Sequence, residues 1–168
     1  MIRVEDWSPI DGLILEPNAM MAATTLGQNV VVAAGPGAGK TELLAQRADF
    51  LLQTGSCPYP RRILAVSFKI DAARNLRERV RLRSGGQFAA RFDSFTFHAF
   101  AKRIIDNYRP ALTGQNALNA NYRVDPDNRI AGEQITFKDL VPLALEILGK
   151  NRYVRGGIRQ TYQGSGHA

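Results

Sequence analysis

The sequence predicts an α/β fold with a mostly parallel sheet and helices on both of its faces. Strand and helix patterns alternate between residues 29 and 108, which favours right-handed crossovers between parallel strands. Of the 168 residues, 45% are hydrophobic and 22% are charged, a balance typical of a globular domain with a sizeable core. The segment 111–132 is polar and rich in Asn, and predicts an irregular connection.

Each element has its own sequence signal. Pro17 and Gly27 delimit a short helix, and the β-branched run NVVVAA predicts a buried strand. Gly and Pro mark residues 54–62 as a loop, Gly85 and Gly86 stop a basic helix, and Thr136 with Asp139 forms a capping-box start. The predicted elements are helix 17–26, strand 29–34, helix 40–53, strand 63–68, helix 71–83, strand 89–93, helix 95–108, helix 136–148 and a further element at 158–162.

Composition excludes several classes of protein. The chain has one cysteine, Cys57, so an intramolecular disulfide is impossible and a reducing compartment fits best. No apolar run approaches the roughly 20 residues of a membrane span. The first twelve residues, MIRVEDWSPIDG, lack the pattern of a signal peptide. We therefore expect a cytoplasmic protein without a membrane partner.

The glycine-rich run AGPGAGKT carries the strongest chemical signal. It lies between the predicted strand 29–34 and the predicted helix 40–53, the context that makes such a phosphate-binding loop credible. Its candidate nucleotide-binding residues are Ala34, Gly35, Pro36, Gly37, Ala38, Gly39, Lys40 and Thr41. Glycines let the backbone approach a phosphate, and the helix N-terminus attracts an anion. Lys40 would contact the β- and γ-phosphates of ATP, and the Thr41 hydroxyl would ligate Mg²⁺, so we assign the catalytic role to these two residues.

Positive charge is concentrated in one part of the chain. Residues 61–109 contain twelve Lys and Arg residues and four acids, while the whole chain has a formal net charge of +7. Arginine suits phosphate through its planar fork, so this block fits a polyanion or, alternatively, a solvated helix face. On the helix 71–83, Arg74, Arg77 and Arg81 form an outward stripe, and Ala73, Leu76 and Val80 face inward.

Two further motifs place aromatic and polar side chains where strands end. Ser67, Phe68 and Lys69 close the strand 63–68, and Thr96, Phe97 and His98 open the helix 95–108. An aromatic ring beside a hydroxyl and a cation can stack a base and hold a phosphate. A core position for the phenylalanines is the alternative interpretation. Cys57, His98 and His167 lack the spacing of metal ligands.

The three motifs, in this order, resemble the N-terminal ATP-binding region of the UvrD/Rep-type superfamily 1 DNA helicases. AGPGAGKT is similar to the first helicase motif, RILAVSFKIDAARNLRERV to an "ILxxTFTxxAAxEMxxRV" segment, and FTFHAFAKRII to a "TFHxFxxxIL" segment. The resemblance implies a P-loop NTPase (RecA-like) parallel sheet with flanking helices, incomplete in this chain, plus a small helical insertion. It also implies a 3′→5′ DNA helicase that binds MgATP and contacts single-stranded DNA through Ser67–Lys69 and Thr96–His98.

The sequence departs from the family pattern in two ways. Ala19 stands where the family has a glutamine that recognises adenine. The D-E-x-Q-D run, which supplies the Mg²⁺-binding aspartate and the water-activating glutamate, is absent from the 168 residues. We expect the N-terminal fragment of a longer helicase, whose remaining domains are its partners and which alone does not hydrolyse ATP.

We expect an ATP-binding core at 1–110, a helical insertion at 111–162 and a linker or cloning remnant at 163–168. Two other functions stay open on sequence grounds. A small P-loop nucleotide or metabolite kinase would need a mobile lid with arginines, for which Arg123 and Arg129 are the candidates. A non-catalytic module would dock its basic helix on a protein or nucleic acid and keep the phosphate loop as a relic.

Overall fold

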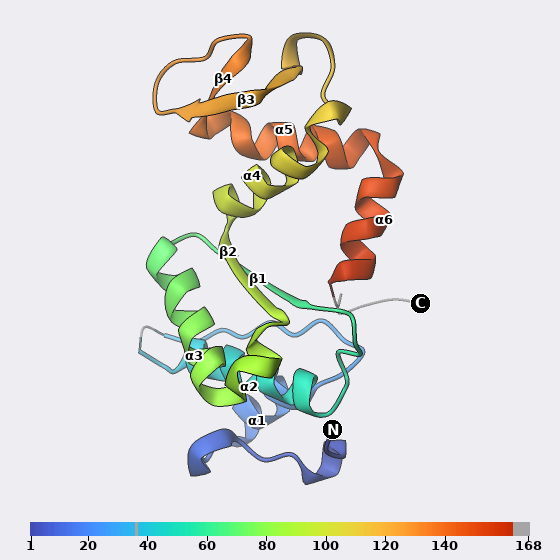
Figure 1. The fold of residues 1–168 in the computed structure, drawn as a ribbon. Coiled ribbons are helices and arrows are strands. Elements are labelled where there is room, and N and C mark those ends of the chain that lie inside the picture. The colour runs from blue at the N-terminus through green and yellow to red at the C-terminus, as the bar shows by residue number, and fades with distance from the viewer. Residues whose placement is uncertain (36, 163–168) are drawn as a thin grey trace. The chain divides into compact units, whose positions relative to one another are not determined.

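The computed structural model describes residues 1–35 and 37–162, and within them the fold is mixed α/β, as predicted (Figure 1). These residues contain six α-helices, four strands and four short 3-10 helices. The elements are η1 (Val4–Asp6), η2 (Ile10–Gly12), α1 (Pro17–Thr24), α2 (Lys40–Gln53), β1 (Ile63–Ser67), α3 (Ile70–Ala89), β2 (Phe92–Thr96), α4 (Phe97–Tyr108), η3 (Arg109–Ala111), η4 (Gly114–Asn116), β3 (Leu118–Asp125), β4 (Gly132–Thr136), α5 (Phe137–Lys150) and α6 (Arg152–Thr161).

The chain folds into two compact units. The first contains Met1–Ser94 together with residues 160–162, and the second is Phe95–Arg159. The predicted domains, 1–110 and 111–162, stay a prediction. The two units meet between Ser94 and Phe95, and within the second unit the apolar face of α4 packs on α5.

The core of the first unit forms around α2. One face of α2 packs on α1 and the N-terminal segment, where Phe50 and Trp7 meet edge to face with ring centroids 5.3 Å apart. Another face packs with α3, and Ala73, Leu76 and Val80 of α3 are buried as predicted. Strands β1 and β2 pair in a two-stranded sheet. Arg62, just before β1, forms a parallel bridge with Tyr162.

The predicted buried strand at 29–34 is wrong. The structure assigns no strand to these residues, and Val31 is 94% exposed. The β-branched run has the propensity for a strand, but a strand also needs a neighbouring strand to pair with. Within the described residues, β1 pairs with β2 and β3 pairs with β4, and neither sheet includes this run.

The second unit is built on α4, α5 and a small parallel sheet. Ile104 and Ile105 of α4 and Leu140, Leu143 and Ile147 of α5 share one core. Strands β3 and β4 pair in parallel with a bulge between Leu118 and Arg123. The prediction of an irregular segment over 111–132 is therefore wrong, since β3 occupies 118–125. In β3, apolar side chains alternate with polar ones, as in a strand with one buried face. The prediction missed this alternation because asparagines, which are typical of loops, occupy two of the polar positions.

Several helix boundaries were predicted correctly or nearly so. Helix α2 covers 40–53 as expected, α1 begins at Pro17, and α5 begins after the predicted capping box of Thr136 and Asp139. Helix α3 continues beyond its predicted end, with a break in helical geometry at Gly85, whose φ is +75°. The predicted element at 158–162 is the end of α6, which starts at Arg152.

Candidate nucleotide and nucleic-acid site

The glycine-rich run forms a tight turn that leads directly into α2. Gly37 and Gly39 have φ values of +78° and +73°, in the left-handed region that favours glycine. The Ala38 amide donates to the Gly35 carbonyl at 3.3 Å, and the Leu43 amide starts the helix by donating to Gly39. Pro36, predicted to belong to this loop, lies outside the described residues. The turn therefore has the backbone conformation that its glycines predict.

Lys40 folds back over this turn. Its Nζ donates to the carbonyl oxygens of Ala34 and Gly35, both at 2.6 Å. The ammonium is exposed and lies at the first residue of α2, where the helix dipole is positive. Among the described residues no side chain caps this helix at Gly39. No described side chain therefore occupies the first N–H groups of α2, and the Lys40 ammonium lies beside this helix end.

The neighbouring α3 holds the start of α2 through charged side chains. Glu42, directly after Thr41, accepts from Arg79 at 2.7 Å and from Arg83 at 3.2 Å. Arg83 also pairs with Asp11 of the N-terminal segment. Sequence reasoning missed this network, because the three elements that it joins lie far apart in the chain. It links α2, α3 and the N-terminal segment through charged side chains.

Arg47 has a structural role. From the middle of α2 its guanidinium donates to the carbonyls of Ala22 at 2.7 Å and Thr25 at 3.0 Å, at the end of α1. A cation at a helix C-terminus is favourable, although burial lowers the pKa of Arg47. An arginine within an otherwise apolar helix stripe was the sequence signal for such a buried contact.

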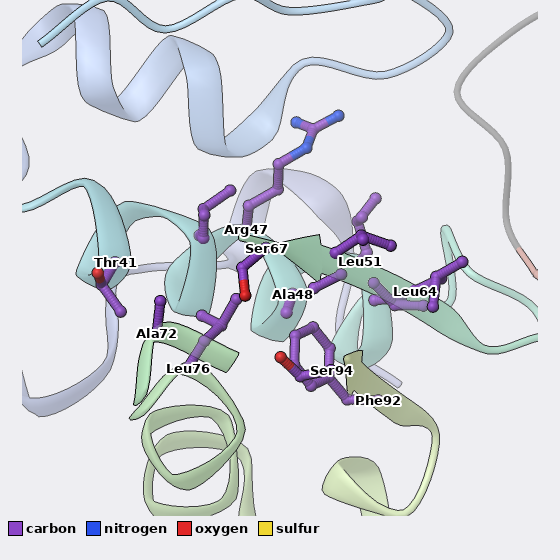
Figure 2. Close-up of a pocket in the computed structure, with 14 residues that line it drawn as sticks. Thr41, Arg47, Ala48, Leu51, Leu64, Ser67, Ala72, Leu76, Phe92 and Ser94 are labelled. Atoms are coloured by element: carbon purple, nitrogen blue, oxygen red, sulfur yellow. The ribbon is translucent and has the colours of Figure 1, made fainter. Parts of the chain in front are cut away.

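A cavity of about 320 Å³ lies between α2, β1 and α3 (Figure 2). Its walls are mainly apolar, with Thr41 and Ser67 both on its lining. Arg47 lines it with its aliphatic part, and its guanidinium points away from the cavity in Figure 2. The cavity thus adjoins both the predicted nucleotide turn and the end of β1.

The residues after β1 are presented to solvent. Phe68 is 88% exposed, which excludes the alternative that it is a core aromatic. The Ser67 hydroxyl donates to the Lys69 carbonyl at 3.0 Å and so shapes the turn before α3. Lys69 is exposed. An exposed aromatic ring, a hydroxyl and a cation therefore lie together at the end of one strand.

The third motif follows β2 and belongs to the second unit. Thr96 caps α4 as predicted, accepting from the Ala99 amide at 3.1 Å. Phe97 is 44% exposed and His98 is exposed, its ring packed edge to face on Phe137 with centroids 6.4 Å apart. This group belongs to the second unit, whereas Ser67–Lys69 belong to the first.

The arginines of α3 are occupied by acidic or backbone partners. Arg74 pairs with Asp71 at 2.5 Å, Arg81 pairs with Glu78 at 3.3 Å, and Arg77 donates to the Ser94 carbonyl at 2.5 Å. The outward stripe predicted on this helix is therefore largely neutralised by its own neighbours.

In the described part of the chain, no group of three or more His, Cys, Asp or Glu side chains could hold a metal ion. Thr41, predicted as the Mg²⁺ ligand, is the second residue of α2 and lies on the lining of the cavity.

The fold, the turn and the strand-end residues define a mixed α/β protein with a glycine-rich turn at the start of a helix and exposed aromatic and polar side chains after two strands. The model of the UvrD/REP helicase N-terminal domain matches residues 15–161, and the chain belongs to this family. Within the described residues, none of the helices is long and apolar enough to cross a membrane.

Curated relatives support the same assignment. The chain is 33% identical over 120 residues to ATP-dependent DNA helicase UvrD1 of Mycobacterium leprae. The aligned region covers 70% of this chain and 15% of that protein. It is 32% identical over 135 residues to UvrD1 of Mycobacterium tuberculosis H37Rv, and this alignment covers 79% of this chain and 17% of that protein. It is 38% identical over 84 residues to ATP-dependent DNA helicase PcrA of Leuconostoc citreum, and this alignment covers 50% of this chain and 11% of that protein. The chain thus spans less than a fifth of the length of these relatives.

Proposed function

We propose that the chain is the N-terminal part of an ATP-dependent 3′→5′ DNA helicase and binds MgATP at residues 34–41. The observation that carries the proposal is the turn before α2, where two left-handed glycines precede an uncapped helix start and Lys40 contacts two carbonyls of the turn. When ATP is bound, its phosphates would replace those carbonyls as partners of the ammonium, and Thr41 would ligate Mg²⁺.

Single-stranded DNA is the proposed second ligand. Phe68 would stack on a base while Ser67 and Lys69 hold the adjoining phosphate, and Thr96, Phe97 and His98 would form a second contact. Phosphoryl transfer by a kinase would require a second substrate pocket beside the turn. The family match over residues 15–161 supports the helicase over that alternative and over a non-catalytic module.

The substitution Lys40→Ala tests the nucleotide site. We expect the unmodified chain to bind a non-hydrolysable ATP analogue and Lys40→Ala to bind it at least tenfold more weakly, measured by titration calorimetry. The matched control is Lys138→Ala, which removes an exposed lysine from the first turn of another helix, α5, and leaves binding unchanged. Equal binding by Lys40→Ala and the unmodified chain would contradict the proposal.

Hydrolysis is measured in the same preparations. Because the sequence contains no D-E-x-Q-D run, we expect no phosphate release from MgATP with or without single-stranded DNA. DNA-stimulated turnover by this chain alone would overturn that part of the mechanism.

A further inference from the structure

Helix α6 has two chemically different faces. Val154 is buried in the core of the second unit, and Ile158 packs against the same core. Arg152, Arg155 and Arg159 are all exposed. At about 100° per residue, their spacing of three and four places them within about 60° of one another on the helix surface. We call these three residues the α6 arginine stripe.

The stripe is not neutralised by acids. The sequence from Ile147 to Tyr162 contains no Asp or Glu. In the described residues none of the three arginines forms an ion pair. Arg155 donates to the Gly149 carbonyl at 3.2 Å. Arg152 lies over the Tyr153 ring, 5.0 Å from its centroid, and donates to the Tyr153 hydroxyl at 3.2 Å. On α3, in contrast, Arg74 and Arg81 each pair with an acid one turn away.

The surroundings of the stripe fit an elongated anion. Gly156 lies on the same face and offers no side chain to hold a ligand away, although a glycine inside a helix costs about 1 kcal/mol relative to alanine. Tyr153 borders the stripe and is 76% exposed. From Arg152 to Arg159 the helix rises by about 10 Å, the length of about three nucleotides along one strand.

We propose that the α6 arginine stripe binds the phosphate backbone of a nucleic-acid strand, without sequence preference. The guanidinium fork suits phosphate oxygens, and the segment from Ile147 to Tyr162 contributes no acid that would repel them. This surface lies apart from Ser67–Lys69 and Thr96–His98 in the chain. It rests on its own charges and does not require nucleotide binding at Lys40.

The experiment compares the full chain with the triple variant Arg152→Ala/Arg155→Ala/Arg159→Ala. Binding to a fluorescent 20-nucleotide thymidine strand and to a 20-base-pair duplex is measured between 50 and 200 mM salt. Each phosphate contact contributes about 0.7 to 0.9 to the slope of log K against log salt. We expect the slope to fall by about 2 to 3 and affinity at 50 mM to fall at least tenfold.

The matched control removes the same charge from ion-paired positions. The variant Arg3→Ala/Arg74→Ala/Arg81→Ala loses three exposed arginines, each paired with an acid, and its slope should stay within about 1 of the unmodified chain. The lysine triple variant of the stripe keeps the charge and should retain most of the slope, which separates charge from loss of fold.

Two outcomes would overturn the inference. One is an unchanged slope in the alanine triple variant, and if that variant also loses binding to vesicles of anionic lipid, the stripe binds lipid instead. The other is an equal loss of slope in the ion-paired control. Failure of the proposed nucleotide site appears in the Lys40→Ala titration and leaves this slope unaffected, so the two proposals fail independently.

Discussion

Phe68 shows how a single side chain can indicate function. It follows the strand β1, yet it is 88% exposed. Burying a phenylalanine side chain stabilises a fold by about 1.5 to 3 kcal/mol. Because Phe68 is exposed to water, its ring contributes little of this stabilisation. Its neighbours supply a hydroxyl and an ammonium, which suits a ring that stacks on a nucleobase.

The substitution Phe68→Ala is expected to weaken binding of single-stranded DNA by about 1 to 3 kcal/mol, the value of one stacked base. Fluorescence anisotropy with a labelled strand measures the loss. Phe68→Tyr keeps the aromatic face and should bind like the unmodified chain. Because the ring is exposed, the free energy of unfolding should change by less than about 0.5 kcal/mol in both variants. Unaltered DNA affinity in Phe68→Ala would remove this residue from the site.

At the residue scale, the sequence predicted local chemistry well and long-range partners poorly. The left-handed glycines and the Thr96 cap follow from short-range rules, and both are present. The contacts of Glu42 with Arg79 and Arg83 depend on how α2 and α3 pack. No local pattern contains that information.

The start of α5 illustrates what decides an element. Thr136 and Asp139 form the predicted capping box, with the Thr136 amide and hydroxyl both donating to Asp139 at 2.8 Å. Burial raises the pKa of Asp139, but these bonds and Arg129 outweigh it and hold the pKa below its ordinary value of 3.8. The folded chain therefore binds this proton less readily than the unfolded chain.

This shift predicts a pH dependence of stability. The contribution of Asp139 is fully present at neutral pH and is lost as pH falls below about 4, through the lowered folded-state pKa. Asp139→Asn should lower the free energy of unfolding by about 1 kcal/mol at pH 7 and by less at pH 3, measured by urea denaturation. Asp127→Asn, at an exposed acid of the preceding loop, is the control. A difference that persists undiminished at pH 3 would contradict this account.

Elements that depend on partners were predicted less well. The run at 29–34 has stronger strand propensity than β3, yet only β3 is a strand. Pairing with β4 and packing of Tyr122 and Val124 on the second core compensate for the asparagines in β3. Helices α2 and α5 were easier, because glycines and capping residues mark their ends locally.

On the scale of the whole molecule, the first unit leaves apolar surface uncovered. Val30, Val31 and Val32 are all exposed, as is Ile14. Unpaired backbone beside contiguous apolar side chains is a recognised route to self-association. The mixed α/β class and family membership were accessible from sequence, whereas this exposure depends on which segments pair in three dimensions.

We expect the chain to self-associate with increasing concentration, and Val31→Lys to reduce this, as measured by sedimentation velocity. A lysine at an exposed strand-like edge opposes pairing with a second chain. Leu82→Lys, which replaces an exposed apolar residue on α3, is the control and should change association less. Equal association of Val31→Lys and the unmodified chain would exclude the valine run as the contact.

Trp7 gives the molecule an intrinsic optical probe. It is the one tryptophan of the sequence, its indole N–H donates to Asp49 at 2.9 Å, and its ring packs on Phe50. Both partners lie on α2, the helix whose first turn adjoins the glycine-rich run. Emission from this indole therefore reports whether the N-terminal segment stays docked on α2, and a ligand that shifts this helix becomes detectable without any attached dye.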